Sequence, residues 1–354
     1  MTEPTLVSDP SQVTSEWLTR VLQYAGIDGR VDSFNAKSIG TGQVGENVRF
    51  ELQGSGAIPR TVVGKFPSSD PVSRQTGIDL GNYIREVHFY RNLQDSVDIQ
   101  TPHDLFSAID EKTHDFVVVM EDLAPGQQGD QIAGCSIEQA ELALTELARL
   151  HGPRWGDETL LVPDLVVASD EDRAINIKGM YDLLAPGFVD RYGARLDENE
   201  TEMVRQVGEH MMAYSMNYRG PLTLIHIDYR LDNMMFGGPY PLAVVDWQSI
   251  AFGCALNDAA YFVGTSVREE ERAGAEKSLL QNYHNELMRY EVSLSFDECW
   301  HYYRHHAPAG LIMAVIASMI VSETDRGNDM FMAMAKRSAR MCLELDSISA
   351  ITNQ

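Results

Sequence analysis

The stretch that decides the fold runs from Leu224 to Gly253 and reads LIHIDYRLDNMMFGGPYPLAVVDWQSIAFG. Two short apolar runs, at residues 223–225 and 242–245, are typical of buried strands, and the turn residues 237–239 lie between them. We therefore expect a hairpin, with polar side chains on it or just after it, held in a fixed relation by apolar walls.

Three polar side chains in this stretch have the chemistry of a phosphoryl-transfer site. Asp228 can accept a hydroxyl proton, while Asn233 and Asp246 offer oxygen ligands to magnesium, a hard cation that takes few protein carboxylates. A single Asp or Asn in a loop is usually a turn former, because its side chain bonds its own backbone. The combination H-x-D-x-x-x-x-N, a hairpin and then D-W-Q is much harder to reach by chance. We predict that Asp228 is catalytic and that Asn233 and Asp246 bind the metal.

A glycine-rich segment precedes the first clear strand. Gly40, Gly42 and Gly45 can let backbone N–H groups approach phosphate oxygens, because glycine has no Cβ to interfere. No Gly-Lys-Ser/Thr follows, so this is not a Walker A loop, and a strand rather than a helix comes next. The alternative is an ordinary glycine-rich hairpin.

A lysine inside an apolar strand is the next candidate. Lys65 lies in VVGKF, where a lysine is costly unless it is paired or ligand-bound. Glu86, on a predicted helix at 81–93, is its natural partner, and the pair would hold the ammonium toward the phosphates. Alternatively, Lys65 points to solvent from an edge strand and Glu86 is a solvated helix residue. The chain order of these features favours the nucleotide-binding interpretation.

The loop after the strand at 116–120 can contact an adenine edge through its backbone. Met120, Glu121 and Leu123 are the candidates for this contact. Since only backbone atoms are needed, side-chain identity proves little, and the acidic pair Glu121–Asp122 can equally belong to a solvated loop.

The rest of the chain indicates an α+β fold with two lobes. Alternating and apolar runs predict strands from about residue 31 to 120, with a turn-rich loop at 53–59, and Ser11–Tyr24 has the stripe of an amphipathic helix. A capping box at Ser136 opens a helix, and further helices are predicted at 175–184, 198–218, 268–290, 296–321 and 329–345. We expect a small β-rich N-lobe at 1–122 and a larger helical C-lobe at 123–354.

Composition limits the classes of partner. The chain has 354 residues and a net charge of −24, which argues against nucleic acid or an anionic membrane, since both attract basic patches. No apolar run approaches the ~20 residues that cross a bilayer, and the polar, acidic N-terminus does not resemble a signal peptide. The four cysteines show no metal-ligand spacing. We expect a cytoplasmic protein; the sequence carries no signal for its oligomeric state.

These residues together resemble the aminoglycoside phosphotransferase and choline kinase superfamily, which has a bilobal protein-kinase-like fold. The likeness is greatest to its ecdysteroid-kinase-like (CHK-kinase-like) group. The motifs that carry it are the glycine segment, VVGKF, REVHFYRNL, VVVMEDL, LARLHGPRW, HIDYRLDN, VVDWQ and NDAAYFV.

The resemblance implies an ATP- and Mg²⁺-dependent kinase that phosphorylates a hydroxyl of a small-molecule alcohol. It also implies that His226 and Asp258 mainly order the backbone. One departure is Ile227, since many relatives have glycine between the His and the Asp. Two alternatives stay open, an antibiotic-type aminoglycoside phosphotransferase and a catalytically idle nucleotide-binding module. The segments expected to contact the acceptor carry no readable code for its identity.

Overall fold

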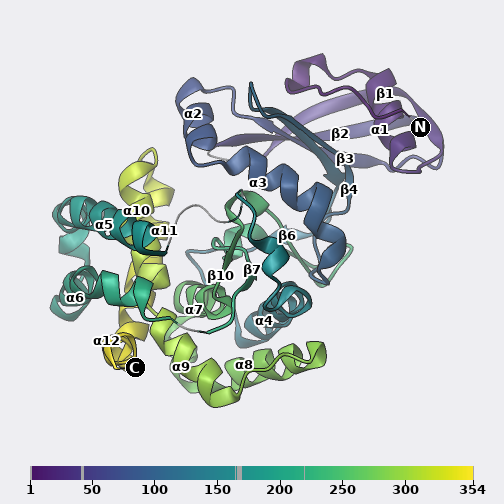
Figure 1. The fold of residues 1–354 in the computed structure, drawn as a ribbon. Helices are drawn as coiled ribbons and strands as arrows, with labels where there is room; N and C mark the ends of the chain where they lie inside the picture. Colours follow the sequence, from purple (N-terminus) through teal and green to yellow (C-terminus); the bar gives the residue numbers. More distant parts are fainter. Residues whose placement is uncertain (1, 41–43, 164, 166–169, 219, 354) are drawn as a thin grey trace. The chain divides into compact units, whose positions relative to one another are not determined.

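The computed structural model describes residues 2–40, 44–163, 165, 170–218 and 220–353, and the chain divides into two compact units (Figure 1). Unit 1 comprises residues 1–96, 100–126 and 237–250; unit 2 comprises residues 97–99, 127–236 and 251–354. The segment 224–253 contributes to both units, because it enters unit 1 at Gly237 and leaves it after Ile250. The predicted lobe boundary at residue 122 stays a prediction.

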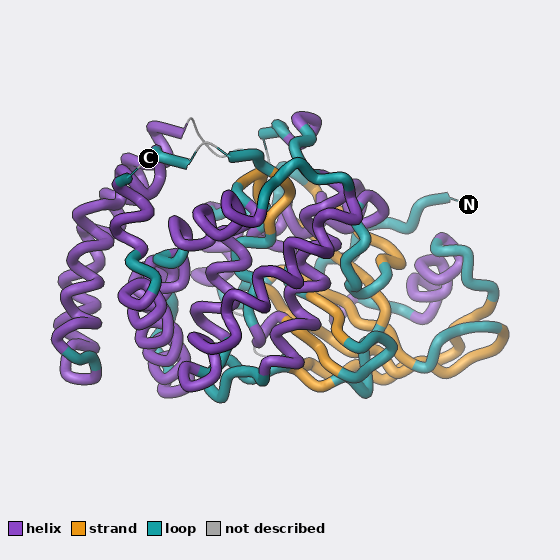
Figure 2. The backbone as a smooth tube through the Cα atoms, turned by 90° about the horizontal axis from the view of Figure 1, so that it is seen from below, coloured by secondary structure: helices purple, strands orange, loops and turns teal. Residues whose placement is uncertain are grey.

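Unit 1 is built on an antiparallel sheet of five strands in the order β1-β2-β3-β5-β4. The strands are β1 (Gly29–Ile39), β2 (Gly45–Gly56), β3 (Thr61–Pro67), β4 (Asp104–Asp110) and β5 (Asp115–Glu121), drawn in orange in Figure 2. The strands predicted at 48–52, 61–66 and 116–120 are confirmed. The loop predicted at 53–59 is wrong over its first half, because β2 stays paired with β1 as far as Gly56.

The helices of unit 1 pack on this sheet or lead to the site. Helix α1 (Ser15–Tyr24) buries one face in the core, and it begins after Thr14, whose hydroxyl accepts a hydrogen bond from the Trp17 N–H. Its predicted start at Ser11 is therefore four residues early. Helix α2 (Pro71–Asp79) was not predicted, because few of its side chains are buried and it has no apolar stripe. Helix α3 (Asn82–His88), with the π turn Phe89–Leu93, confirms the predicted helix.

Unit 2 is mostly helical. Its helices are α4 (Ile137–His151), α5 (Asp170–Tyr192), α6 (Glu198–Met216), α7 (Ala255–Ser266), α8 (Glu269–Leu287), α9 (Phe296–His306), α10 (Ala309–Ile320), α11 (Asp325–Glu344) and α12 (Ser347–Thr352). The capping box of Ser136 with Gln139 at the start of α4 is confirmed. Helix α7 was missed because it is buried on nearly all sides and so shows no polar face. Figure 1 shows α5, α10 and α11 side by side.

Two predictions for this unit need correction. The single helix predicted at 296–321 is two helices, because Pro308 has no N–H to donate to the carbonyl four residues earlier. The strands predicted at 223–225 and 242–245 are present, but they do not pair with each other as a hairpin. Strand β7 (Thr223–Ile225) pairs with β10 (Ala251–Gly253), and β8 (Met234–Phe236) pairs with β6 (Gln127–Gln128). The stretch at 242–244 is a strand, β9, and belongs to unit 1.

No helix in the described part of the chain is both long enough and apolar enough to cross a membrane. The two units, one carrying the sheet and one mainly helical, agree with the predicted α+β class.

Candidate active site

The nucleotide half of the candidate site lies in unit 1 and centres on Lys65. The side chain is buried in β3, and its Nζ lies 2.8 Å from Glu86 Oε2 and 2.7 Å from Asp246 Oδ1. Glu86 comes from α3, and Asp246 follows β9. The expected Lys65–Glu86 ion pair is therefore present, and Asp246 joins it.

The charges in this cluster depend on one another. Burial alone would lower the pKa of Lys65, but the carboxylates of Asp246 and Glu86 outweigh it and raise that pKa above its ordinary value. Burial raises the pKa of Glu86 to about 7, and the positive charge of Lys65 only partly opposes that rise. Lys65 is thus a permanent cation shared by two carboxylates.

The backbone of Asp246 is held in an unusual conformation by the aromatic residue that follows it. Asp246 has φ of 71° at the start of the 3-10 turn Trp247–Ser249. Trp247 is fully buried, donates from Nε1 to Thr101 Oγ1 at 2.8 Å, and stacks on Phe89 with ring centroids 3.7 Å apart. This packing fixes the direction in which the Asp246 carboxylate points.

The glycine segment is partly described. Gly40 has a left-handed φ of 73°, which favours glycine, while Gly42 lies outside the described residues. Gly45 is the first residue of β2 and pairs with Pro67 at the end of β3. A Cβ at Gly45 would lie 3.2 Å from the Phe66 carbonyl oxygen, so the strand is close-packed there.

The predicted adenine-contacting backbone is partly engaged within unit 1. Met120 pairs with Val63 in the sheet. The Glu121 N–H donates to the His103 carbonyl at 2.9 Å, and the Leu123 carbonyl accepts the Gly126 N–H at 2.8 Å. A nucleotide base would have to use the groups that these bonds leave free.

The loop at residues 226–233, which carries the predicted catalytic residue Asp228, lies in unit 2. Oδ1 accepts hydrogen bonds from Tyr261 Oη at 2.8 Å and Arg230 Nε at 2.9 Å, and Oδ2 accepts one from Asn233 Nδ2 at 2.9 Å. Burial would raise the pKa of Asp228, but the charge of Arg230 and the Tyr261 hydrogen bond outweigh it, so the pKa lies below its usual value. The carboxylate is therefore ionised and held in one orientation.

Asp258, on α7, orders the start of this loop. It accepts the N–H of His226 at 2.6 Å and the N–H of Ile227 at 2.9 Å, and it lies 3.4 Å from His151 Nε2. His151 is fully buried, and its other ring nitrogen lies 2.8 Å from the Tyr283 hydroxyl. Ile227 has φ of 70°, the left-handed region that a β-branched residue rarely adopts.

Sequence reasoning missed three residues that hold this loop. The Tyr261 hydroxyl donates a hydrogen bond to Asp228. Tyr261 lies in the NDAAYFV motif, but the motif alone does not indicate this contact. Asp232 accepts from Arg230 Nη1 at 2.9 Å and from both Arg326 Nη atoms, at 3.1 and 3.0 Å. Arg326, at the start of α11, is 94 residues away in the chain, and no local pattern indicates it.

The donor chemistry of the two predicted metal ligands fits magnesium. Asn233 turns Nδ2 toward Asp228, donating to the backbone carbonyl and to Oδ2, both at 2.9 Å. Among the described residues, no group donates a hydrogen bond to its carbonyl oxygen, which is therefore open to a cation. Asp246 contributes a carboxylate, partly exposed, and both residues supply the oxygen atoms that Mg²⁺ prefers.

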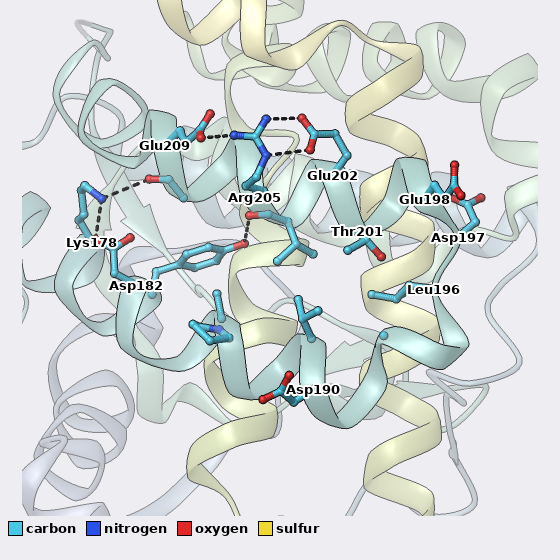
Figure 3. A pocket seen from close by; sticks show the side chains of 17 residues that line it. Lys178, Asp182, Asp190, Leu196, Asp197, Glu198, Thr201, Glu202, Arg205 and Glu209 are labelled. Atoms are coloured by element: carbon cyan, nitrogen blue, oxygen red, sulfur yellow. Dashed lines mark hydrogen bonds and ion pairs between the residues drawn. The ribbon is translucent and has the colours of Figure 1, made fainter.

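A groove of about 950 Å³ lies between α5 and α6 in unit 2 (Figure 3). Its charged lining has six acidic and two basic side chains: Asp182, Asp190, Asp197, Glu198, Glu202, Glu209, Lys178 and Arg205. Figure 3 shows Arg205 paired with both Glu202 and Glu209, and Lys178 paired with Asp182. The acidic groups outnumber these cations, so the groove has an excess of negative charge.

Comparison with known proteins agrees with the sequence motifs. The model of the ecdysteroid kinase-like family matches residues 177–296. Among solved structures, the GDP complex of a mutant aminoglycoside 2'-phosphotransferase-IIIa is 15% identical with a TM-score of 0.55, and the match covers 92% of this chain and 98% of that chain. Ethanolamine kinase from Plasmodium vivax is 12% identical with a TM-score of 0.53, covering 90% and 84%.

A further structure, the GDP and kanamycin complex of APH(2")-IIia, is 15% identical with a TM-score of 0.51, covering 92% and 99%. No curated protein sequence matches. Likeness at this level of identity shows the fold, which is the predicted kinase-like one. The comparisons thus confirm the resemblance to the aminoglycoside phosphotransferase and choline kinase superfamily and, within it, to the ecdysteroid kinase-like group.

Proposed function

We propose that this protein is an ATP- and Mg²⁺-dependent kinase that transfers a γ-phosphoryl group to a hydroxyl of a small organic molecule. The observation that carries the proposal is the 2.9 Å hydrogen bond from Asn233 Nδ2 to Asp228 Oδ2. It holds an ionised carboxylate beside an amide whose free oxygen suits a metal, which is the donor pair that phosphoryl transfer to an alcohol requires.

In the proposed reaction, Asp228 orients the alcohol and accepts its proton. Lys65, kept charged by Glu86 and Asp246, contacts phosphate oxygens. The backbone at Gly40 and Gly45 covers the phosphates, and the backbone at Met120, Glu121 and Leu123 contacts the base. Asn233 and Asp246 would hold magnesium, which when bound would supply charge neutralisation on the phosphates. Catalysis then comes mainly from positioning and electrostatics.

The groove between α5 and α6 supports a cationic acceptor as one candidate. Its excess of carboxylates would attract an ammonium group, while apolar lining residues such as Val189 and Leu196 would also accommodate an uncharged ring system. Kanamycin, which is bound in one similar structure, and ethanolamine, after which a second similar protein is named, both carry amines and hydroxyls. An aminoglycoside-type acceptor therefore remains the second candidate.

Binding of Mg-ATP and Mg-GTP by calorimetry is the first test, since similar structures contain GDP. The second is a panel of ethanolamine, kanamycin, spectinomycin and a hydroxysteroid, with phosphorylated products detected by mass spectrometry. We expect nucleotide binding that depends on magnesium, and a product with an amino alcohol. Absence of any magnesium-dependent nucleotide binding would refute the kinase and would equally refute the catalytically idle nucleotide-binding module.

Asp228→Asn separates catalysis from binding. We expect this variant to bind Mg-ATP like the wild type and to lose turnover by about 10²–10⁴-fold. Turnover at the wild-type rate would remove Asp228 from the role of base.

A further inference from the structure

The hydrogen bonds around Asp228 are distributed unequally between its two oxygens. An ionised carboxylate has about four acceptor positions, two on each oxygen. Both positions on Oδ1 are taken, by the Tyr261 hydroxyl at 2.8 Å and Arg230 Nε at 2.9 Å. Within the described residues, Oδ2 accepts only from the side chain of Asn233. One acceptor position therefore remains, and it is on Oδ2.

Arg230 is itself held in place by a second carboxylate, that of Asp232. Its Nε donates to Asp228, while its Nη1 donates to Asp232 Oδ2 at 2.9 Å. Asp232 is held in turn by the forked guanidinium of Arg326 and by the Gln131 N–H at 3.2 Å. The guanidinium of Arg230 is thus clamped between two carboxylates, and rotation of Asp228 would break both of its Oδ1 bonds.

Tyr261 is fixed in the same way. It lies on α7 with 1% of its surface exposed, and the same helix provides Asp258, which accepts the N–H groups of His226 and Ile227. One rigid helix therefore holds both the backbone at the start of the loop and one oxygen of the carboxylate.

We propose that Asp228 Oδ2 is the atom that takes the proton of the acceptor alcohol, and that Tyr261 and Arg230 are positioning residues that reserve it by occupying Oδ1. This inference rests on the proposed kinase function. It adds which oxygen reacts and which residues select it.

The reaction at this atom balances as follows. The alcohol oxygen donates a lone pair to the γ-phosphorus, and an O–P bond forms. The bond from the γ-phosphorus to the β–γ bridging oxygen breaks, and its electron pair leaves with ADP. The hydroxyl proton passes to Asp228 Oδ2 and then to solvent, so the products are a phosphate monoester, ADP and a proton.

The test compares two Tyr→Phe variants of the full chain. Tyr261→Phe removes a hydrogen bond to Oδ1, whereas the control, Tyr303→Phe, removes an equally buried bond to a carboxylate, from the Tyr303 hydroxyl to Glu276 Oε1 at 2.6 Å. Turnover is measured with Mg-ATP and the best acceptor of the panel, or with water as acceptor. We expect Tyr261→Phe to lower kcat about ten- to a hundredfold with KM for ATP unchanged, and Tyr303→Phe to keep kcat.

A second arm asks whether the two residues act through Asp228. In an Asp228→Asn background, Tyr261→Phe and Arg230→Gln should cause no further loss, because the group they position is gone. Arg230→Lys should fail to restore activity, because a single ammonium cannot replace a fork held between Asp228 and Asp232.

The outcomes separate this inference from the proposed function. If the wild type transfers phosphoryl groups but Tyr261→Phe matches Tyr303→Phe, or if its loss adds fully to that of Asp228→Asn, the positioning role is refuted. If the wild type shows no phosphoryl transfer, the proposed function fails first. A crystal structure in which the Tyr261 hydroxyl does not reach Oδ1 would overturn the assignment of the oxygens in either case.

Discussion

The ammonium of Lys65 lies 2.7 Å from Asp246 Oδ1 and 2.8 Å from Glu86 Oε2, although Asp246 is 181 residues away in the chain. The lysine thus contacts both its helix partner and the carboxylate proposed to bind magnesium. Its positive charge compensates two acidic groups, of which Glu86 is 1% exposed. Substitutions in this cluster should therefore change stability and nucleotide binding together.

Stability should depend on pH through Glu86. The pKa of about 7 in the folded protein is above the ordinary 4.5, so the folded state binds the proton more tightly. The resulting stabilisation is complete below about pH 4.5 and is lost as the pH rises through about 7. We expect the free energy of unfolding, from urea denaturation, to fall by roughly 1–3 kcal/mol between pH 5 and 8 from this group. Glu86→Gln should flatten that part of the profile, and an unchanged slope would contradict the assignment.

Lys65→Met should weaken Mg-ATP binding. The variant loses the cation proposed to contact the phosphates, and it leaves the Asp246 carboxylate uncompensated, which repels an anionic ligand. We expect the dissociation constant for Mg-ATP to rise at least about tenfold by calorimetry. Lys277→Met, at a surface lysine over the Trp300 ring, is the control and should bind like the wild type.

Ile227 should be replaceable by glycine with a gain in stability. Its φ of 70° costs about 1–2 kcal/mol for a residue with a Cβ, and glycine adopts this conformation freely. The loss of chain entropy by glycine offsets part of this, so we expect Ile227→Gly to raise the free energy of unfolding by up to about 1 kcal/mol. Ile227→Val keeps the strain and should give no gain. If the glycine variant is the less stable of the two, the strain is not significant.

Asp258→Asn should loosen the loop at residues 226–233. An asparagine offers one acceptor oxygen where the carboxylate accepts two backbone N–H groups, from His226 and Ile227. We expect a loss of about 1–3 kcal/mol in the free energy of unfolding, together with a lower kcat. The control is Asp329→Asn, at an exposed ion pair with Arg195, where a change above about 1 kcal/mol is not expected.

Acid should destabilise the fold through His306. This side chain is buried, and burial, with the neighbouring His305 and Arg173, holds its pKa well below 6.5. The folded state therefore favours the neutral ring, and the stabilisation present above pH 6.5 is lost as the pH falls below it. We expect His306→Gln to lose less unfolding free energy than the wild type between pH 6.5 and 5. The exposed His103, changed to Gln, serves as the control and should follow the wild-type curve.

The sequence by itself determined the elements with a strong local signature. Alternating strands such as 61–66, the capped helix after Ser136, and the spacing from Asp228 to Asn233 are properties of short segments, so they can be read without a fold. Helices without a clear hydrophobic periodicity were not predicted. Helix α7 is buried on nearly all sides, and α2 has no apolar stripe. The proline at 308 indicates the end of a helix, but the long apolar run at 309–320 favoured one continuous helix.

Only the tertiary structure decided which residues contact the predicted site residues. It pairs β7 with β10, places Asp246 against Lys65, and puts Tyr261 and the Arg326–Asp232 pair behind Asp228. These partners come from elements far apart in the chain, and their contact depends on how helices and strands pack. Hydrophobic periodicity reports only which face of an element is buried. It carries no information about which element lies opposite, and therefore none about which oxygen of Asp228 is left free.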